Sequence, residues 1–153
     1  LKYYTLYVCS GYEQEEDFYQ EYHKELYETS NIIPMGFVDI ESETFREISY
    51  KCTFAILPSC AEGCAGSILT AMSAGMIPIV SKECGFEDDE VINLPDCKME
   101  TIFGYVVEYS QKDQNWLKNA AKHSMEIVHS RYSKLCFSHS VEKALDGVLA
   151  NTK

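Results

Sequence analysis

Apolar and polar positions follow one another along the chain in a pattern that predicts alternating strands and helices. The runs Tyr4–Cys9 and Thr53–Leu57 are rich in apolar, β-branched and aromatic residues, which is typical of buried strands. Two further runs, Asn31–Gly36 and Ile77–Ser81, predict strands that each contain a proline. The proline of the first run hints at an edge strand or a strand start, and Pro78 lies at the entry of the second, where a missing amide hydrogen costs least.

The segments between and after these runs show apolar residues at helical spacing. The first of them begins with several acidic residues, which suit the amino terminus of a helix. Gly75 ends the third, and the polar stretch Lys82–Asp96 connects to the last three. The predicted helices are Glu13–Glu28, Ser42–Cys52, Ser67–Ala74, Lys98–Tyr109, Asp113–Arg131 and Ser133–Leu149.

This order of elements predicts an α/β fold. Strands that alternate with helices form a parallel sheet with right-handed crossovers and helices on both faces. The three consecutive helices at the carboxyl end break the alternation, so we expect a small sheet with extra C-terminal helices. A length of 153 residues suits a single domain over residues 1–153. Because Leu1 is not a methionine and an interior-type strand follows at once, we expect a fragment of a longer protein.

Charge and cysteine usage narrow the classes of function. The net charge of −11 argues against nucleic acid or an anionic membrane as partner, because both need a basic surface. Seven cysteines with no C-x-x-C pair and no zinc-like spacing favour a reducing, cytoplasmic location. No apolar run reaches the length of a transmembrane helix. The acidic triplet Asp88–Glu90 lacks Asp-x-Asp spacing, so we interpret it as solvated loop charge and expect no metal.

The most informative segment is the loop Pro58–Ser67. From Cys52 to Ser81 the only charged residue is Glu62, which lies inside this loop between a predicted strand and a predicted helix. Small residues let a ligand approach the backbone, and the helix that follows leaves amide hydrogens unpaired at its positive end. Together these features predict an anion site without lysine or arginine, in which Ser67 is the helix N-cap or turns its hydroxyl to a phosphate.

Glu62 points to a second class of ligand group. A carboxylate repels a phosphate but accepts hydrogen bonds from hydroxyl groups, so a ligand that offers both a phosphate and hydroxyls is a nucleotide sugar. The alternative stays open at this point. Glycine-rich turns occur in many α/β folds, and a lone glutamate can simply cap backbone amides.

The segment P-S-C-A-E-G-C-A-G-S-I-L-T-A-M-S-A-G-M-I-P-I-V-S, residues 58–81, resembles a known signature. It is similar to the donor-site motif of retaining group 1 glycosyltransferases with the GT-B fold, P-S-x-x-E-G-F-G-L-P-x-x-E-A-M-A-x-G-x-P-V-I-x-S. The resemblance covers nearly the whole chain and implies most of the C-terminal, Rossmann-like half of such an enzyme. The first strand–helix unit of that half and the N-terminal acceptor-binding domain would then be absent.

The resemblance also implies roles for individual residues. Glu62 would contact hydroxyls of the donor sugar, and the backbone amides of Gly63, Cys64, Ala65, Gly66 and Ser67 would hold its sugar and diphosphate. The turn Gly36–Phe37–Val38 would lie against the nucleotide base, and Ser10–Gly11 would lie near the phosphates or the base.

Two departures from the family pattern matter. The second glutamate of the motif, which grips the ribose in the family, is Thr70 here. The Phe-Gly-Leu-Pro part is Cys64–Ser67, which keeps the small residues but shifts the glycine. Cys60 and Cys64 border the loop, where we expect them to pack in its wall.

The implied function is transfer of a hexose from a nucleoside diphosphate sugar to an unknown acceptor, with retention and without a metal. The enzyme would belong to carbohydrate biosynthesis and be cytoplasmic, or reach the inner membrane through the absent half, and the fragment alone would be inactive. The alternative is a non-catalytic sugar-nucleotide-binding or scaffold domain derived from the same fold. A third class, an unrelated flavodoxin-like signalling module, would need acidic residues at the strand ends, where Ser10, Ser59 and Ser81 stand instead.

Overall fold

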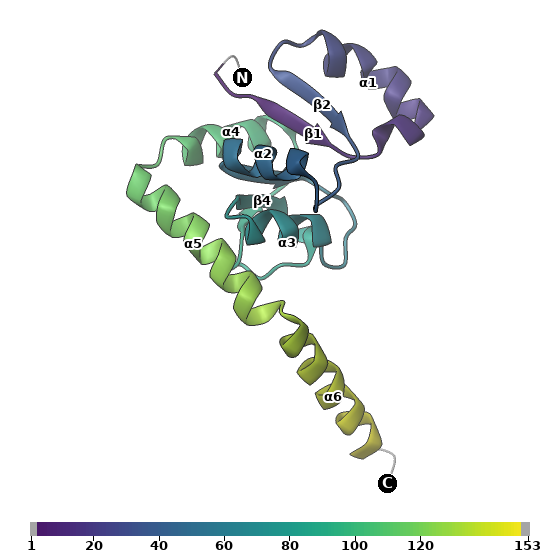
Figure 1. Ribbon diagram of the computed structural model, residues 1–153, viewed down its shortest axis with the longest axis vertical. Helices are drawn as coiled ribbons and strands as arrows, with labels where there is room; N and C mark the ends of the chain where they lie inside the picture. The colour runs from purple at the N-terminus through teal and green to yellow at the C-terminus, as the bar shows by residue number, and fades with distance from the viewer. Residues whose placement is uncertain (1–2, 151–153) are drawn as a thin grey trace. The chain divides into compact units, whose positions relative to one another are not determined.

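The computed structural model describes residues 3–150, which fall into two compact units, Leu1–Lys51 and Cys52–Lys153. Each unit contains a sheet, and every strand pair found among the described residues is parallel (Figure 1). The fold is therefore a mixed α/β, Rossmann-like arrangement of parallel strands flanked by helices, as the sequence pattern predicts. The division of the strands between two sheets is a feature that the pattern did not indicate.

The first unit is built on a two-stranded sheet. Strand β1 (Leu6–Cys9) pairs with β2 (Ile32–Gly36), and the helix α1 (Glu16–Glu28) connects them, as a parallel pair requires. A short 3-10 helix, η1 (Tyr12–Gln14), precedes α1, and α2 (Glu43–Lys51) follows β2. Among the described residues of this unit, the buried side chains are Tyr12, Leu26 and Ile48.

The second unit contains the sheet β3 (Phe54–Leu57), β4 (Ile77–Ser81) and β5 (Ile92–Leu94), in that order. All five residues of the central strand β4 are buried. Because the three strands are parallel, their carboxyl ends lie at one edge of the sheet. The chain leaves β3 at that edge and enters the loop that the sequence analysis singles out.

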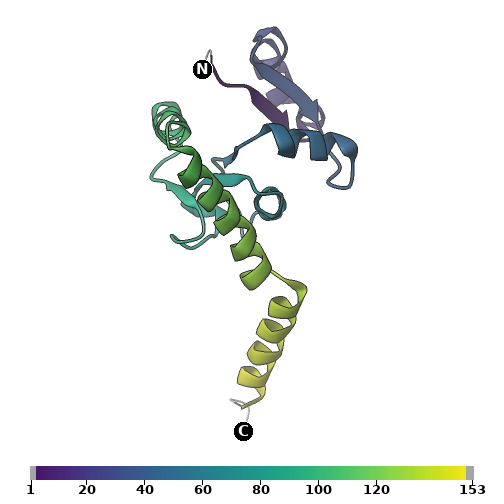
Figure 2. The ribbon, with the colours of Figure 1, turned by 60° about the vertical axis from the view of Figure 1, so that its left-hand side comes forward.

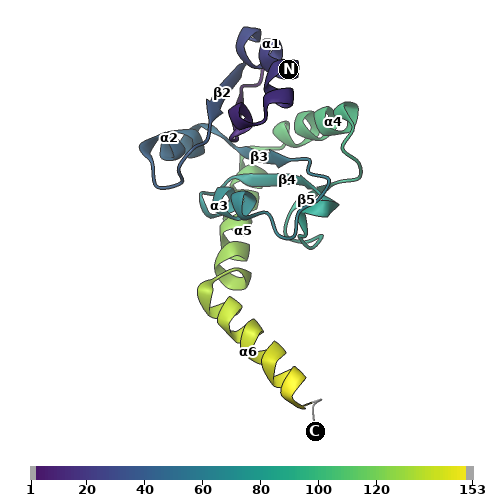
Figure 3. The ribbon, with the colours of Figure 1, turned by 90° about the vertical axis from the view of Figure 1, so that its right-hand side faces the viewer.

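Helices cover this sheet on both sides. The helix α3 (Gly66–Ser73) packs on β3 and β4, and α5 (Gln114–Arg131) packs on α3 and β4. The helix α4 (Met99–Ser110) packs against β5 and lies across the strands from α3 (Figure 3). The buried core between these elements is formed by Ala65, Ile68, Met72, Val80, Cys84, Phe86 and Ile127.

The last helix, α6 (Lys134–Ala150), continues the chain after α5 (Figure 2). The sequence predicts a helix here with Phe137, Val141, Leu145 and Val148 on one face, and the structure confirms the helix. All four of these side chains are exposed. No described helix is long and apolar enough to cross a membrane.

The predicted elements are present with small shifts of their ends, but the polar stretch 82–96 is not without structure. It contains a 3-10 helix, η2 (Lys82–Cys84), and the strand β5. A strand of three residues that includes Asn93 gives no alternation long enough to detect, and its pairing with β4 comes from tertiary packing.

Candidate functional site

The loop of residues 58–67, which we call the Glu62 loop, connects β3 to α3 at the carboxyl edge of the sheet (Figure 3). Within the loop Ala61 N donates to the hydroxyl of Ser59 at 3.4 Å. Residues 60–64 are exposed, whereas Ala65 is buried in the core of the unit. The loop is therefore anchored at its end and open to solvent along its middle.

Backbone amides are available where the loop becomes helix. Ala65 has extended backbone angles and is the N-cap of α3, and its carbonyl accepts from the amides of Ile68 and Leu69 at 3.0 and 3.1 Å. Within the described part of the chain, no acceptor bonds the amides of residues 63–67. These amides, together with the helix dipole, form the partial positive charge that an anion requires.

The expectation that Ser67 is the N-cap is wrong. Ser67 lies inside the first turn of α3, one residue after Gly66, and no side chain caps this helix. Ala65 takes the N-cap position because the chain is still extended there, with φ −69° and ψ 97°. A cap that offers no side-chain oxygen leaves the first amides of the helix free for a ligand.

Glu62 lies beside these amides without using them. Its backbone amide donates to the carbonyl of Glu83 at 3.1 Å, while its side chain is exposed. Among residues 3–150, no hydrogen bond or ion pair to the Glu62 carboxylate is found. The interpretation of Glu62 as a cap for the loop's own amides therefore has no support in the geometry. The carboxylate is free to accept hydrogen bonds from a ligand.

Thr70 stands where the family motif has its second glutamate, and its hydroxyl is already engaged. Its Oγ1 donates to the carbonyl of Gly66 at 3.0 Å, one turn back along α3. A threonine hydroxyl has one proton, so it could meet a ligand only through the lone pairs on its oxygen. It cannot replace the two acceptor oxygens of a carboxylate.

Residues 81–90, which we call the brace segment, support the Glu62 loop from the neighbouring strand. The hydroxyl of Ser81 donates to the carbonyl of Ser59 at 2.5 Å, and the fully buried Cys84 thiol donates to the carbonyl of Leu57 at 3.4 Å. Gly85 has φ +76° and faces Gly63 so closely that a Cβ on Gly85 would lie 2.0 Å from the carbonyl oxygen of Gly63.

The acidic triplet at the end of the brace segment differs from the prediction. Only Asp88 and Asp89 are exposed, while Glu90 is 3 % exposed and bonded on both of its oxygens. One oxygen accepts from Arg131 at 2.9 Å, and the other accepts from the hydroxyl of Tyr132 at 2.8 Å and from the amide of Glu87 at 2.9 Å. The prediction that the triplet is solvated charge is therefore wrong for Glu90. Arg131 and Tyr132, which bind its carboxylate, lie more than 40 residues away in sequence, so no local pattern indicates this burial.

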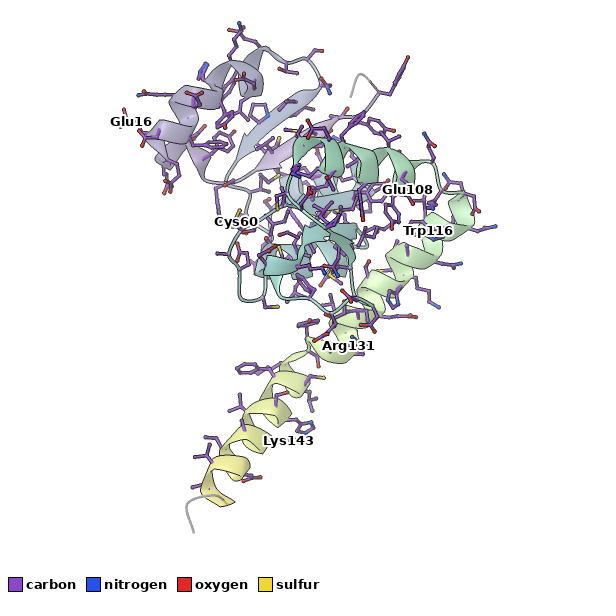
Figure 4. The ribbon with its side chains drawn as sticks, turned by 180° about the vertical axis from the view of Figure 1, so that it is seen from behind. Glu16, Cys60, Glu108, Trp116, Arg131 and Lys143 are labelled. Atoms are coloured by element: carbon purple, nitrogen blue, oxygen red, sulfur yellow. The ribbon has the colours of Figure 1, made fainter. Side chains whose placement is uncertain are left out.

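Arg131 holds the neighbouring acid as well. It contacts both oxygens of Asp89, at 2.6 and 3.1 Å. This hydrogen-bonded pair lowers the pKa of Asp89 and raises the pKa of Arg131, because each charge is stabilised by the other. Figure 4 shows Arg131 in the last turn of α5. Sequence reasoning missed Arg131 and Tyr132, and no motif in the sequence connects them to residues 89 and 90.

The other predicted contacts lie in the first unit, at the carboxyl ends of β1 and β2. Ser10 N donates to the carbonyl of Gly36 at 2.9 Å, so the Ser10–Gly11 turn and the Gly36–Val38 turn lie side by side. Gly36 has φ +63°, and its amide donates to the hydroxyl of Tyr12 at 3.1 Å. Phe37 is 80 % exposed. An exposed aromatic ring beside a glycine turn is suited to contact a flat ligand group.

The cysteines around the loop do not pack as expected. Cys60 and Cys64 are exposed, whereas Cys84, in the brace segment, is buried. Although Cys64 is exposed as a residue, partial burial of its sulfur and the nearby charge of Glu90 raise its pKa, which keeps the thiol protonated. Among the described residues, no group of three or more His, Cys, Asp or Glu side chains could hold a metal ion.

The profile of one protein family, described as "Glycosyl transferases group 1", matches residues 2–122. The chain belongs to the group 1 glycosyl transferases. The match includes both groups of candidate contacts, the brace segment and the first part of α5, and it ends before Arg131 and α6. A comparison with curated proteins finds no match. Membership of the glycosyl transferases implies a sugar donor.

Proposed function

We propose that this chain is the donor-binding part of a retaining glycosyltransferase that uses a nucleoside diphosphate sugar. The transferred group would be a hexose, and a domain outside these 153 residues would hold the acceptor. The single observation that carries the proposal is the pairing of unbonded amides at residues 63–67 with the unbonded carboxylate of Glu62.

The signs of these groups support a donor with two kinds of contact. The amides and the start of α3 attract the diphosphate, and no carboxylate in the first turn of α3 opposes it. The Glu62 carboxylate accepts hydrogen bonds, so it suits the hydroxyls of the sugar. Placed the other way round, a phosphate against Glu62 would be repelled.

The remaining candidate residues would contact the base and the ribose of the same donor. The exposed ring of Phe37 and the backbone of Val38 would contact the base, with the Ser10–Gly11 turn beside them. The ribose would be held more weakly than by a carboxylate, since Thr70 offers only lone pairs while it donates to Gly66.

The chemistry asked of this chain is electrostatic. As the bond from sugar to diphosphate breaks, negative charge grows on the leaving phosphate, and amides fixed by the start of a helix stabilise it without reorganising. Glu62 would orient the sugar while its ring gains positive charge. No side chain here has to transfer a proton and no metal is required in this proposal, which describes a cytoplasmic enzyme of carbohydrate synthesis.

The test is a titration of the ¹⁵N-labelled chain with a nucleoside diphosphate, and separately with its glucose and mannose derivatives. We expect the amide signals of Gly63–Ser67 to shift with every ligand that carries the diphosphate. Absence of any shift at these amides at millimolar ligand would contradict the proposal.

Two matched variants separate sugar contacts from phosphate contacts. Glu62→Gln keeps the shape of the side chain and removes the charge, so it should weaken the sugar nucleotides about tenfold and the bare nucleotide little. Glu83→Gln removes an exposed charge and keeps the backbone carbonyl that accepts from Glu62 N. It should leave both affinities unchanged.

The second candidate is a sugar-nucleotide-binding domain without transferase activity, and the engaged hydroxyl of Thr70 favours it. The Thr70→Glu variant restores the carboxylate of the family motif. A large gain in donor affinity would show that the natural site is a weakened one, and retention of transferase activity by the natural full-length protein would exclude the non-catalytic alternative.

A further inference from the structure

We infer that the brace segment sets the position of the Glu62 loop, and that Arg131 and Tyr132 are positioning residues that hold the brace segment. This inference rests on the proposed function only for the identity of the ligand. The position of the loop itself can be measured without any ligand.

The Glu62 loop depends on the brace segment because it has few contacts of its own. Among the described residues, the only backbone–backbone hydrogen bond made by residues 60–64 joins Glu62 N to the carbonyl of Glu83. Two residues further along the brace, Gly85 lies directly against Gly63. The carboxylate that would bind the sugar and the first amide that would bind the diphosphate are therefore both placed by the same short segment.

Gly85 is the tightest point of this contact. A Cβ at this position would lie 2.0 Å from the carbonyl oxygen and 3.0 Å from the carbonyl carbon of Gly63. These are backbone atoms, which cannot rotate away as a side chain can. Any side chain on residue 85 must displace the loop at Gly63, beside the amides of residues 63–67.

The opposite end of the brace segment is fixed to α5. Glu90 is almost completely buried, and its charge is balanced by Arg131 and by the hydroxyl of Tyr132. The ring of Tyr132 also packs edge-on against Phe86, with the ring centres 6.1 Å apart. A buried carboxylate must keep its partners, so residues 86–90 follow the end of α5. Tyr132 fixes the position of Phe86, and Phe86 in turn fixes its neighbour in sequence, Gly85.

The decisive experiment compares Gly85→Ala with Gly75→Ala. Both glycines have positive φ, +76° and +83°, so alanine introduces similar backbone strain at each. The difference is the neighbour, since a Cβ at Gly75 would meet only the flexible end of Met125, at 3.8 Å. The comparison therefore separates displacement of the loop from strain of the backbone.

We expect ligand-free spectra to show large shifts of the amides of Glu62–Ser67 in Gly85→Ala and none in Gly75→Ala. In titrations, Gly85→Ala should bind nucleoside diphosphate sugars about tenfold or more weakly, because a misplaced contact group loses most of its effect. The bare nucleoside diphosphate should lose less, since it makes no contact with Glu62. A change of overall stability alone would not produce this split between the two ligands.

A second pair of variants tests the hold by α5 and guards against failure of Gly85→Ala to fold. Tyr132→Phe removes the hydroxyl bonded to Glu90 and keeps the ring on Phe86. It should shift the amides of Gly85 and Glu62 and weaken sugar-nucleotide binding about twofold to fivefold. Tyr109→Phe removes a hydroxyl from another half-buried tyrosine of the same unit and should shift neither amide.

The outcomes are distinguishable. Unshifted amides of Glu62–Ser67 in both Gly85→Ala and Tyr132→Phe would overturn the inference, as would equal shifts in Gly85→Ala and Gly75→Ala. If the natural chain binds no sugar nucleotide, the proposed function fails. The ligand-free spectra would then still decide whether the brace segment positions the loop.

Discussion

The two turns that carry the candidate contacts, the Glu62 loop and the Gly36–Val38 turn, differ in how deeply the strands next to them are buried. In the second unit the Glu62 loop lies beside β4, whose five residues are all buried, and is held by the brace segment. In the first unit the Gly36–Val38 turn follows β2, none of whose residues is fully buried, in a sheet of only two strands. Both turns present backbone groups at the carboxyl ends of parallel strands, but only one of them sits on a packed core.

This difference bears on how each turn would meet a ligand. A region with little buried apolar surface opens locally at a lower free energy than a packed core does. A two-stranded sheet is also marginal by itself. We therefore expect the Glu62 loop to be preorganised for the diphosphate and sugar, and the Gly36–Val38 turn to adapt to its ligand group as it binds.

The largest effect expected from this contrast is on stability. Ile79 in β4 is completely buried, so Ile79→Ala should lower the free energy of unfolding by about 3–4 kcal/mol. Ile33 in β2 is only half-buried, so Ile33→Ala should lower the free energy of unfolding of the first unit by about 1 kcal/mol. Urea unfolding measures both effects, with circular dichroism reporting on the whole chain and the fluorescence of Trp116, in α5, reporting on the second unit.

The sharpest form of this test is the position of the Trp116 transition. Ile79→Ala should move it, and Ile33→Ala should leave it in place. An equal shift in both variants would show that the two sheets unfold together. The proposed difference in stability between the two sheets would then be wrong.

A second effect, smaller in free energy, is the reactivity of one cysteine in each unit. Cys9 ends β1 and is exposed, although partial burial of its sulfur raises its pKa, while Cys84 lies completely buried beneath the Glu62 loop. Iodoacetamide at pH 8.5 should modify Cys84 at least about a hundredfold more slowly than Cys9, since Cys84 must wait for the brace segment to open. Mass spectrometry of peptides gives both rates. Comparable rates would mean that the brace segment opens as readily as the edge of the small sheet.

A third effect concerns the ion pairs. The ion pairs found in the described part of the first unit join neighbours on α2, as in Arg46–Glu43, whereas in the second unit Arg131 joins Asp89 across 42 residues. Arg131 lowers the pKa of Asp89 below its ordinary value of 3.8. The stability that this carboxylate adds is therefore present above pH 3.8 and is lost as the pH falls through the lower folded-state pKa.

Asp89→Asn should accordingly reduce stability slightly at pH 7, and its difference from the natural chain should shrink as the pH falls below 3.8 through the lowered folded-state pKa of Asp89. Urea unfolding at a series of pH values measures this. The effect is small because Asp89 and Arg131 are largely exposed, and water weakens their attraction. A difference that stays constant down to pH 2 would show that Asp89 acts through something other than its charge.

Much of the fold could be predicted from the sequence because the signals are local. The strands of four or five residues and the longer helices have enough residues for their periodicity to show, although β1, β2 and β3 are less buried than the pattern indicates. The small residues of the Glu62 loop mark it as a turn. The strand β5 could not be predicted, since three residues become a strand only by pairing with β4. The division into two sheets depends on long-range packing, about which local patterns carry no information.

The candidate site divides in the same way. Glu62 and the amides of residues 63–67 follow from a charge pattern and a helix start, which are visible in the sequence. The burial of Glu90 could not be seen there, since an acid triplet normally faces water and its partner Arg131 lies 41 residues away. The N-cap at Ala65 was also hidden, because Ser67 is the better capping residue by preference but lies two residues too late, inside the first turn of α3.

The smallest stability effect is expected at Gly11, whose backbone conformation any residue can adopt, in contrast to Gly85, whose missing side chain the packing requires. Gly11 in the first unit has φ −76°, which any residue can adopt, and a Cβ there would meet only the side chain of Gln14, at 3.9 Å. Gly11→Ala should therefore change the free energy of unfolding by less than about 0.5 kcal/mol. Gly85→Ala should lower the free energy of unfolding far more, because its Cβ would clash with the backbone of Gly63.

This near-neutral stability makes Gly11→Ala a clean probe of the ligand. If phosphates or base approach the Ser10–Gly11 turn closely, the added methyl group will occupy their space and weaken nucleoside diphosphate binding although the fold is intact. Calorimetric titration of the variant measures this directly. Unchanged affinity would mean that no part of the ligand comes within contact of the Ser10–Gly11 turn, and that this turn does not belong to the donor site.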